Sequence, residues 1–438
     1  MSKRLLCQLQ LSNYNTEGKF LLECDSGFQM CMGRVREMLK LDPDLRIDIL
    51  GPQRTQLFTQ PEEIYPELFV SGQANYVSIY IPANALQTRY EFRMDEVAES
   101  LGLHNHKSDK SLRYDVVYVN DPMWLTKLKA MFLLRGGYQP FFAVHSHFVD
   151  SAASPKFPIE ASLWLGQVEA ALKADWNFWQ CESALQEFYV EVSKTLKPEL
   201  VDQIMAKSIS WDDGYSHSEI TSRIVDPQAL RFDTSEFDRL VKGKLVLFYP
   251  NRIGGRGRSS DYTAGGKLLF ELLPKLRKLR QDYVLIAGNP SQKFSNAELE
   301  AECGPNGFVS LVPDALRRDE FKWICRRADV SLGTYPITGS DTYGGTAARE
   351  CVALGTAPFW MDCNEYASLA DSCQPPWPYR SSNDFSNFVE KLSQLMDDIS
   401  NPELTQRMFE LKLSLQTEVK NRCSYESTTS RMMKKMNL

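Results

Sequence analysis

Hydrophobic positions in the first 200 residues follow two alternating periods. Short runs of consecutive apolar and β-branched residues predict buried strands at 4–9, 45–50, 76–81, 90–92, 114–119, 141–145 and 176–179. Between several of these runs, apolar residues recur at helical spacing and predict helices at 28–39, 124–134, 162–174 and 183–195. Apolar strands that alternate with helices are typical of a parallel sheet covered on both faces.

This alternation stops in a turn-rich stretch and then starts again. Residues 201–240 include Asp212-Asp213-Gly214 and Asp226-Pro227, which favour turns. Beyond this stretch the same pattern predicts strands at 244–249, 283–287, 308–312, 330–335 and 357–361, and helices at 264–279, 319–328, 384–398 and 402–420.

We therefore expect an α/β chain of two Rossmann-like domains that face each other across a central cleft. The predicted boundaries are 1–200 for the N-terminal domain, 201–240 for a linker and 241–398 for the C-terminal domain. A helical tail over 399–438 would pack back on the first domain. Ligands of such folds bind at the carboxyl ends of the strands.

Composition and charge narrow the classes of protein. A hydrophobic content of 43% with 24% charged residues is typical of a folded chain and not of a disordered one. The net charge of -6 argues against a chain that is basic all over, but it leaves room for a local basic groove. The first residues lack a signal peptide, and no apolar run nears the roughly 18 residues that span a bilayer. We expect a cytoplasmic protein with no membrane span.

The cysteines do not predict a metal site. The chain has 10 of them, none in a Cys-x-x-Cys pair and none at zinc-finger spacing. We interpret them as reduced, mostly buried thiols.

The stretch from Asp341 to Trp360 carries the clearest candidate chemistry. It contains a glycine turn, a short helix with one acid, Glu350, and then Gly-Thr-x-Pro before a buried strand. A helix that starts at Gly344-Gly345 presents free backbone N–H groups and a positive dipole end, which suit a phosphate. Glu350 can accept hydrogen bonds from hydroxyls. The alternative is an ordinary connection with a surface glutamate.

A second candidate phosphate site follows the strand at 244–249. The sequence there is Asn-Arg252-Ile-Gly-Gly-Arg256-Gly-Arg258, in which glycines permit a close approach and arginines supply forked donors. Neither a P-loop nor a Gly-x-Gly-x-x-Gly that opens a helix is present, so a dehydrogenase has little support. The alternative is a solvated Arg/Gly loop.

Two histidines lie at the end of the predicted strand at 141–145 and just after it. His145 and His147 would lie at the carboxyl end of that strand, where they could bind sugar hydroxyls or share a proton with an acceptor. The alternative is one packed and one solvent-facing histidine. We find no further ligands placed to complete a metal site.

Together these motifs resemble the retaining GT-B glycosyltransferases. Arg252 matches the family's first base after the first strand of the C-terminal domain, and Arg256 or Arg258 stands for the second base, commonly a lysine. Glu350 matches the second acid of the family's Glu-x7-Glu motif, which binds the nucleotide ribose. Thr342 stands where the first glutamate is expected.

The chain departs from this family in some details, and it also has a narrower resemblance. Asp341 lies beside the departure at Thr342, and the Gly-Gly loop usual after the first strand is missing. Bacteriophage DNA α-glucosyltransferases also depart at the first glutamate. They are similar to this chain in the His-x-His after an N-domain strand, in the Asn-Arg start and in the Gly-Thr-x-Pro end of the helix motif, which Phe-Trp follows in this chain.

The resemblance implies a retaining hexosyl- or pentosyltransferase that moves a sugar from a nucleoside-diphosphate sugar, such as a UDP-sugar, to a hydroxyl. It assigns the acceptor to 1–200, favours a hydroxymethylated DNA base, and assigns the nucleotide sugar to 241–398. The catalytic residues would be His145, His147, Arg252 and Glu350. The donor would contact Arg252, Arg256, Arg258, Asp341, Thr342, Gly344, Gly345, Thr346 and Glu350.

No metal or further cofactor is expected, because arginines and a helix dipole can stabilise the departing diphosphate. Three alternatives remain open: transfer to a glycan or a small molecule, a nucleotide-sugar epimerase or phosphorylase, and a non-catalytic nucleotide-binding module. The sequence does not determine the oligomeric state.

Overall fold

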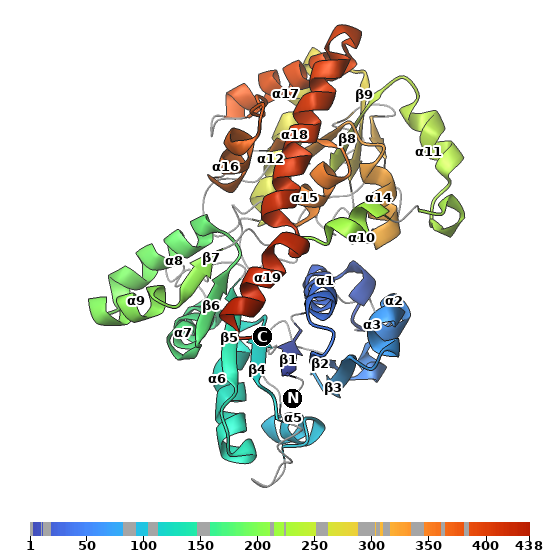
Figure 1. The fold of residues 1–438 in the computed structure, drawn as a ribbon. Coiled ribbons are helices and arrows are strands. Elements are labelled where there is room, and N and C mark those ends of the chain that lie inside the picture. The colour runs from blue at the N-terminus through green and yellow to red at the C-terminus, as the bar shows by residue number, and fades with distance from the viewer. Residues whose placement is uncertain are drawn as a thin grey trace. The chain divides into compact units, whose positions relative to one another are not determined.

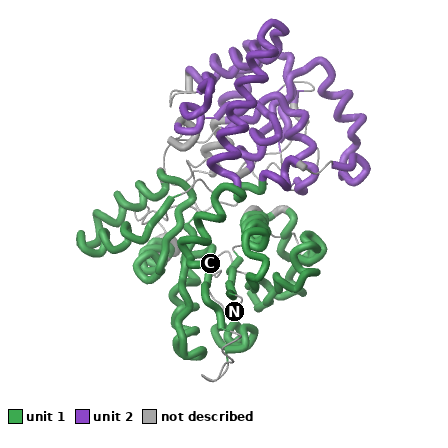
Figure 2. The backbone as a smooth tube through the Cα atoms, in the orientation of Figure 1, with its two compact units in different colours: residues 1–216, 425–438 green, residues 217–424 purple. Residues whose placement is uncertain are grey.

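The computed structural model divides the chain into two compact units (Figure 2). Unit 1 contains residues 1–216 and 425–438, and unit 2 contains residues 217–424. The residues that the structure describes are 3–9, 11, 19–81, 93–103, 113–146, 158–210, 214–222, 225–250, 262–287, 303, 307–309, 316–333, 346–360, 364–380 and 385–438. Among them, no helix combines the length and the apolar character that crossing a bilayer requires.

Unit 1 is built on a seven-stranded sheet whose paired strands are all parallel. In sheet order the strands are β3 (Ala74–Ile79), β2 (Arg46–Pro52), β1 (Arg4–Gln8), β4 (Val116–Val119), β5 (Phe141–Ser146), β6 (Trp176–Trp179) and β7 (Ser208–Ser210). The chain builds outward from β1 in one direction and from β4 in the other. The order of the strands therefore reverses between β1 and β4.

Helices cover both faces of this sheet (Figure 1). They are α1 (Ser26–Leu41), α2 (Pro61–Ile64), α3 (Pro66–Val70), α5 (Met94–Ser100), α6 (Pro122–Met131), α7 (Pro158–Lys173), α8 (Glu182–Thr195), α9 (Pro198–Met205) and α19 (Tyr425–Lys435). Successive residues of β1 join opposite cores, since Leu5 and Cys7 pack with α1 whereas Leu6 packs with α6. Both faces are apolar, which explains why the strands read as continuous hydrophobic runs.

Unit 2 repeats this plan with five parallel strands. In sheet order they are β10 (Phe308–Val309), β9 (Tyr283–Ala287), β8 (Leu245–Tyr249), β11 (Val330–Gly333) and β12 (Ala357–Trp360). Its helices are α10 (His217–Ser222), α11 (Thr234–Val241), α12 (Tyr262–Leu279), α14 (Arg318–Cys325), α15 (Thr346–Ala353), α16 (Asn364–Ser372), α17 (Phe385–Ser400) and α18 (Thr405–Cys423). Here the strand order reverses between β8 and β11.

Aspartates fix the amino-terminal edges of both sheets. Each stands directly before a strand and accepts a hydrogen bond from an early backbone N–H of the neighbouring strand, which would otherwise lack a partner at the sheet end. The pairs are Asp115 with Arg4 (2.8 Å), Asp175 with Phe142 (2.7 Å) and Asp329 with Val246 (2.8 Å). The same device therefore aligns strands in both units.

The stretch 201–240 is more ordered than its turn-rich sequence predicts. Besides the end of α9 it contains β7, which extends the sheet of unit 1, and also α10 and α11. These elements are short, and β7 carries the polar sequence Ser-Ile-Ser, so the hydrophobic periods do not reveal them. The unit boundary at 216/217 lies inside this stretch.

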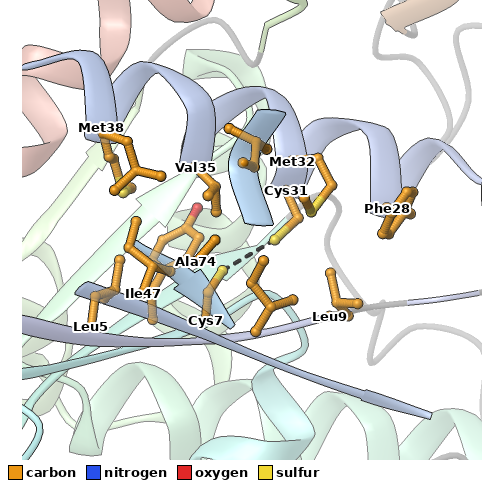
Figure 3. Packing of buried hydrophobic residues seen from close by; sticks show 14 of the residues in the cluster. Leu5, Cys7, Leu9, Phe28, Cys31, Met32, Val35, Met38, Ile47 and Ala74 are labelled. Carbon is orange, nitrogen blue, oxygen red and sulfur yellow. Dashed lines mark hydrogen bonds between the residues drawn. The ribbon is translucent and has the colours of Figure 1, made fainter. Parts of the chain in front are cut away.

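The C-terminal segment is shared between the units. Helix α18 belongs to unit 2, whereas α19 belongs to unit 1 and packs against α1. Apolar side chains of α1 point toward β1 in Figure 3, and the same core includes Met432 and Met433 of α19 and Met436, which follows that helix. A methionine-rich helix can fill an irregular surface of this kind because its side chains are flexible.

A glycine permits the closest approach of these two helices. A Cβ atom on Gly33 would lie 2.6 Å from the ring of Tyr425, a separation that real Cβ atoms do not tolerate. The Tyr425 ring also lies against Arg34, whose guanidinium carbon is 5.5 Å from the ring centroid. Gly33 is therefore required by packing, even though glycine weakens the middle of a helix.

We expect Gly33→Ala to lower the free energy of unfolding of unit 1 by about 1–3 kcal/mol, because the added methyl group overpacks against Tyr425. In a Tyr425→Ala background the same change should stabilise by up to about 1 kcal/mol, because alanine is the better helix former. Melting temperatures of the four proteins test this reversal of sign. An equal loss in both backgrounds would contradict the assigned contact.

Candidate functional site

The two predicted phosphate-binding segments leave the sheet of unit 2 from neighbouring strands. Leu247 pairs with Val330 and Phe248 with Ser331, so the carboxyl ends of β8 and β11 lie side by side. The arginine-rich segment follows β8 in the chain, and the segment with the glycine pair follows β11. These strand ends flank the point where strand order reverses, which is where open α/β sheets bind ligands.

Most of the predicted donor-contacting residues lie outside the described part of the chain. They are Arg252, Arg256, Arg258, Asp341, Thr342, Gly344 and Gly345. Thr346 is the first residue of α15, and its side chain lies outside the described part of the structure. The roles assigned to these residues stay predictions.

Glu350 lies in α15 and is held in a partly buried ion pair. Both terminal nitrogens of Arg318, the first residue of α14, donate to it: Nη1 to Oε2 at 2.6 Å and Nη2 to Oε1 at 2.5 Å. The side chain of Glu350 is 5% exposed and that of Arg318 is 21% exposed. Glu350 is therefore neither an exposed surface acid nor an isolated buried charge.

This pair belongs to a larger group of charges. Glu219 of α10 lies 3.5 Å from Nε of Arg318 and 3.9 Å from Nζ of Lys322. Acids and bases thus alternate from Glu350 through Arg318 and Glu219 to Lys322, across three helices of unit 2. Such alternation reduces the cost of placing charges in the interior.

The Gly-Thr-x-Pro motif after α15 has structural roles. Gly355 adopts φ +97°, which ends the helix and favours glycine. The hydroxyl of the buried Thr356 donates to the carbonyl of Cys325 at 2.7 Å and so ties the turn to the end of α14. Pro358 lies in β12, at the end of the sheet order, where a missing N–H is tolerated.

Trp360 closes this motif by packing over β11. Its indole N–H donates to the hydroxyl of Ser331 at 3.2 Å. A Cβ atom on Gly333 would lie 2.7 Å from the indole ring, so the ring crosses the end of β11 only because a glycine is there. The Phe-Trp end of the motif is thus explained by packing.

His145 lies near the carboxyl end of β5 in unit 1, as predicted, but it is fully buried. Nη1 of Arg34, which is also buried, is 2.8 Å from its Nδ1. The hydroxyl of Tyr118 is 3.0 Å from the same nitrogen and is a second partner of Arg34. His147 lies outside the described residues.

These contacts define the hydrogen-bonding state of His145. A guanidinium has donors only, so Nδ1 must accept from Arg34. The proton of the neutral ring is therefore on Nε2. Of the two roles considered for His145, donation of a hydrogen bond to a hydroxyl fits this state, whereas a base would need an unprotonated Nε2.

Further polar residues line the carboxyl edge at the reversal point of unit 1. The side-chain carbonyl of Gln8 accepts from the backbone N–H groups of Asn120 (3.1 Å) and Asp121 (3.0 Å), and the Asn120 side-chain amide donates to the backbone carbonyl of Gln8 at 2.6 Å. Asp121 also caps α6 by accepting from Met123. The sequence suggested only a turn at Asn-Asp-Pro, although its place after a buried strand is a signal for this edge.

Arg34 and Arg318 were not predicted as site residues. A signal for Arg318 exists in the sequence, because Arg317-Arg318 begins a helix, where the macrodipole disfavours cations. Arg34 offers no such signal, since it lies within an ordinary amphipathic helix.

Cysteines in each unit form close thiol pairs. Cys7 and Cys31 lie 3.2 Å apart between their sulfurs in unit 1 (Figure 3), and Cys325 and Cys351 lie 3.4 Å apart in unit 2. The contact with Cys7 and burial raise the pKa of Cys31, and burial and the contact with Cys351 raise that of Cys325. Within the described ranges, no three His, Cys, Asp or Glu residues gather as a metal site.

We expect Thr356→Val to destabilise unit 2 by about 1–3 kcal/mol, because it leaves the buried carbonyl of Cys325 without this donor. Thr356→Ser retains the hydroxyl and serves as the control. Melting temperatures measure the effect. A Val variant that melts like the wild type but binds nucleotide more weakly would show that the hydroxyl contacts ligand instead.

Comparisons with known proteins identify the fold. No protein-family model matches the sequence, and no curated protein matches it. A UDP-forming α,α-trehalose-phosphate synthase from Burkholderia xenovorans, in complex with glucose-6-phosphate, matches with a TM-score of 0.63 and 14% identity over 100% of both chains.

Two further structures match over nearly the whole length. A trehalose-6-phosphate structure from E. coli, bound with UDP-2-fluoro glucose, has a TM-score of 0.61 and 14% identity, covering 99% of each chain. A putative UDP-N-acetylglucosamine 2-epimerase from Listeria monocytogenes has a TM-score of 0.54 and 11% identity, covering 100% of this chain and 96% of the other. The expected α/β fold with two Rossmann-like domains, the GT-B fold, is confirmed.

Proposed function

We propose that this protein transfers a sugar from a nucleoside-diphosphate sugar to a hydroxyl acceptor. The proposal is supported by the match in fold, over the whole length, to proteins whose names include UDP-forming synthesis and a UDP-sugar ligand. The donor would bind in unit 2, at the carboxyl ends of β8 and β11, and the acceptor in unit 1.

The position of Glu350 carries the proposal. It lies in the helix that follows the glycine pair, beside the strand where the order of the sheet reverses. The fork from Arg318 occupies one lone-pair position on each of its oxygens. The remaining lone pairs point to opposite sides of the carboxylate, and one of them would accept from a ribose hydroxyl.

The remaining donor contacts rest on the sequence. Arg252, with Arg256 or Arg258, would neutralise the diphosphate, and backbone N–H groups from Gly344 onward would bind its oxygens. These groups stabilise the negative charge that develops as the sugar leaves, so the reaction needs no metal. Asp341 and Thr342 would lie toward the sugar.

His145 would donate a hydrogen bond from Nε2 to a sugar or acceptor hydroxyl. This contact would orient the hydroxyl, but a protonated Nε2 could not abstract a proton from it. Because the ring is buried, the groups over it would have to move for such a contact. We assign no base to the reaction. Retention of the anomeric configuration follows from the family resemblance alone.

For the acceptor, we propose a hydroxymethylated DNA base as the first to test. The support is the likeness in the His-x-His and in the Gly-Thr-x-Pro motif with its Phe-Trp end; the three similar solved structures are not DNA-modifying enzymes by name. The base would have to be flipped out of the duplex to react. The Listeria match favours an epimerase as the second candidate, which would convert the donor without any acceptor.

We expect sugar transfer when the protein is incubated with a panel of nucleotide sugars and either hydroxymethyl-base DNA or a mixture of glycans and sugar phosphates. Mass spectrometry of donor and acceptor reads the result. A mass shift in the DNA supports the DNA acceptor, and a shift only in the other acceptors removes it. An epimerised donor in the absence of acceptor would replace transfer by epimerisation.

We expect Arg252→Ala to lower kcat about 10²–10³-fold through loss of diphosphate stabilisation. Glu350→Ala should lower kcat/KM by about tenfold or more through loss of ribose contacts. Glu390→Ala, at an exposed position of α17, is the control and should be inert. Wild-type rates in both site variants would contradict the proposed donor site.

A further inference from the structure

The proposed function does not by itself require Arg318. It begins α14, where the helix dipole disfavours a cation, and its side chain is 21% exposed. An arginine placed there needs a compensating acid. Glu350 of α15 supplies it through two charge-assisted hydrogen bonds of 2.6 and 2.5 Å.

The geometry of this pair restricts the carboxylate. The terminal torsion of a glutamate side chain is broad, so a carboxylate with a single contact can rotate. Two parallel hydrogen bonds from a planar guanidinium fix the carboxylate plane, which one bond from a lysine cannot do.

Arg318 is in turn held from its other side. Oε1 of Glu219 lies 3.5 Å from Nε, the nitrogen that does not take part in the fork. Lys322, buried one turn further along α14, lies 3.9 Å from the same acid. The guanidinium is thus contacted by acids on two edges, which orients the fork toward Glu350.

We propose that Arg318 is a positioning residue that makes Glu350 selective for a ribose with its 2′-hydroxyl. It holds the carboxylate in one plane, so that the outer lone pair of one oxygen can accept from that hydroxyl. A nucleotide that lacks the hydroxyl then leaves an acceptor unpaired in a buried site, which weakens its binding. This inference rests on the proposed binding of a nucleotide at Glu350.

Titration calorimetry with UDP, ADP and GDP and their 2′-deoxy forms tests the inference. We expect wild-type protein to bind the preferred ribonucleotide about tenfold or more tightly than its deoxy form. Arg318→Gln should reduce this ratio to about threefold or less, and Arg318→Lys should leave it in between, because lysine restores charge but not the fork. Loss of packing alone would weaken both nucleotides equally and leave the ratio unchanged.

The same helix supplies a matched control. Arg231 forks onto Glu320 of α14 with Nε and Nη2 each at 2.7 Å, and these side chains are 26% and 1% exposed. Arg231→Gln therefore breaks a similar buried pair without touching Glu350. We expect it to retain the wild-type ratio, and melting curves confirm that each variant is folded.

The outcomes separate the inference from the proposed function. If Glu350→Gln loses the preference for ribose while Arg318→Gln retains it, Glu350 binds the ribose hydroxyl but Arg318 does not position it, and the inference is wrong. If wild-type protein shows no preference, or binds none of the nucleotides, the ribose contact itself is wrong and both proposals fail. If Arg231→Gln loses the ratio as Arg318→Gln does, the effect is general to α14 and the inference is also wrong.

Discussion

The parallel pairing of β1 with β4, and of β8 with β11, is the constraint on which the rest of the structure depends. Parallel neighbours bring their carboxyl ends to one edge, and at these two pairs the chain continues in opposite directions along the sheet. Both faces of the strands are apolar, so polar side chains with a chemical role can stand only at the strand ends. In unit 1 that edge carries Gln8, Asn120 and His145. The opposite edge is fixed by aspartates that accept backbone N–H groups.

An arginine sets the state of each of the two described candidate residues; Arg34 is buried and Arg318 is partly buried. Arg34 determines which nitrogen of His145 accepts, and Arg318 occupies one side of the Glu350 carboxylate. Replacing a buried charge pair by apolar side chains is often neutral or stabilising, so such pairs are weak evidence for a role in stability. Instead, these pairs fix the orientation of a partner, because each arginine restricts a side chain that could otherwise rotate or change its proton position. Each unit thus uses an arginine to orient a candidate site residue, which is a histidine in unit 1 and a glutamate in unit 2.

Motifs that resemble a ligand site can be explained in part by packing. Gly355 ends a helix at positive φ, Thr356 ties two helices together, and Gly333 makes room for Trp360. These residues shape the turn after α15 and so help to fix the helix that carries Glu350. A sequence motif of this kind therefore combines residues that hold the backbone with one residue available for chemistry. Sequence alone does not separate them, because both kinds are polar or small and adjacent in the chain.

Several features followed from the sequence by itself. Apart from β7, the apolar runs predicted the strands of both sheets to within a few residues, including β6 and β9 at their observed bounds, because a strand buried on both faces admits few polar residues. The predicted strand at 90–92 lies outside the described residues. The doubling of the strand–helix alternation predicted the two-domain fold. Short or polar elements such as β7 escaped, since three residues carry no period.

Only the tertiary structure decided which side chains meet. Arg34 and His145 are 111 residues apart, and Arg318 and Glu350 are 32 apart, so no local pattern relates them. The docking of α19 on α1 likewise depends on the fit of Tyr425 over Gly33. Local sequence determines where strands and helices form, because propensity and burial act on neighbouring residues. Contacts between distant residues are decided by how those elements pack, and in this chain they determine the state of His145 and Glu350.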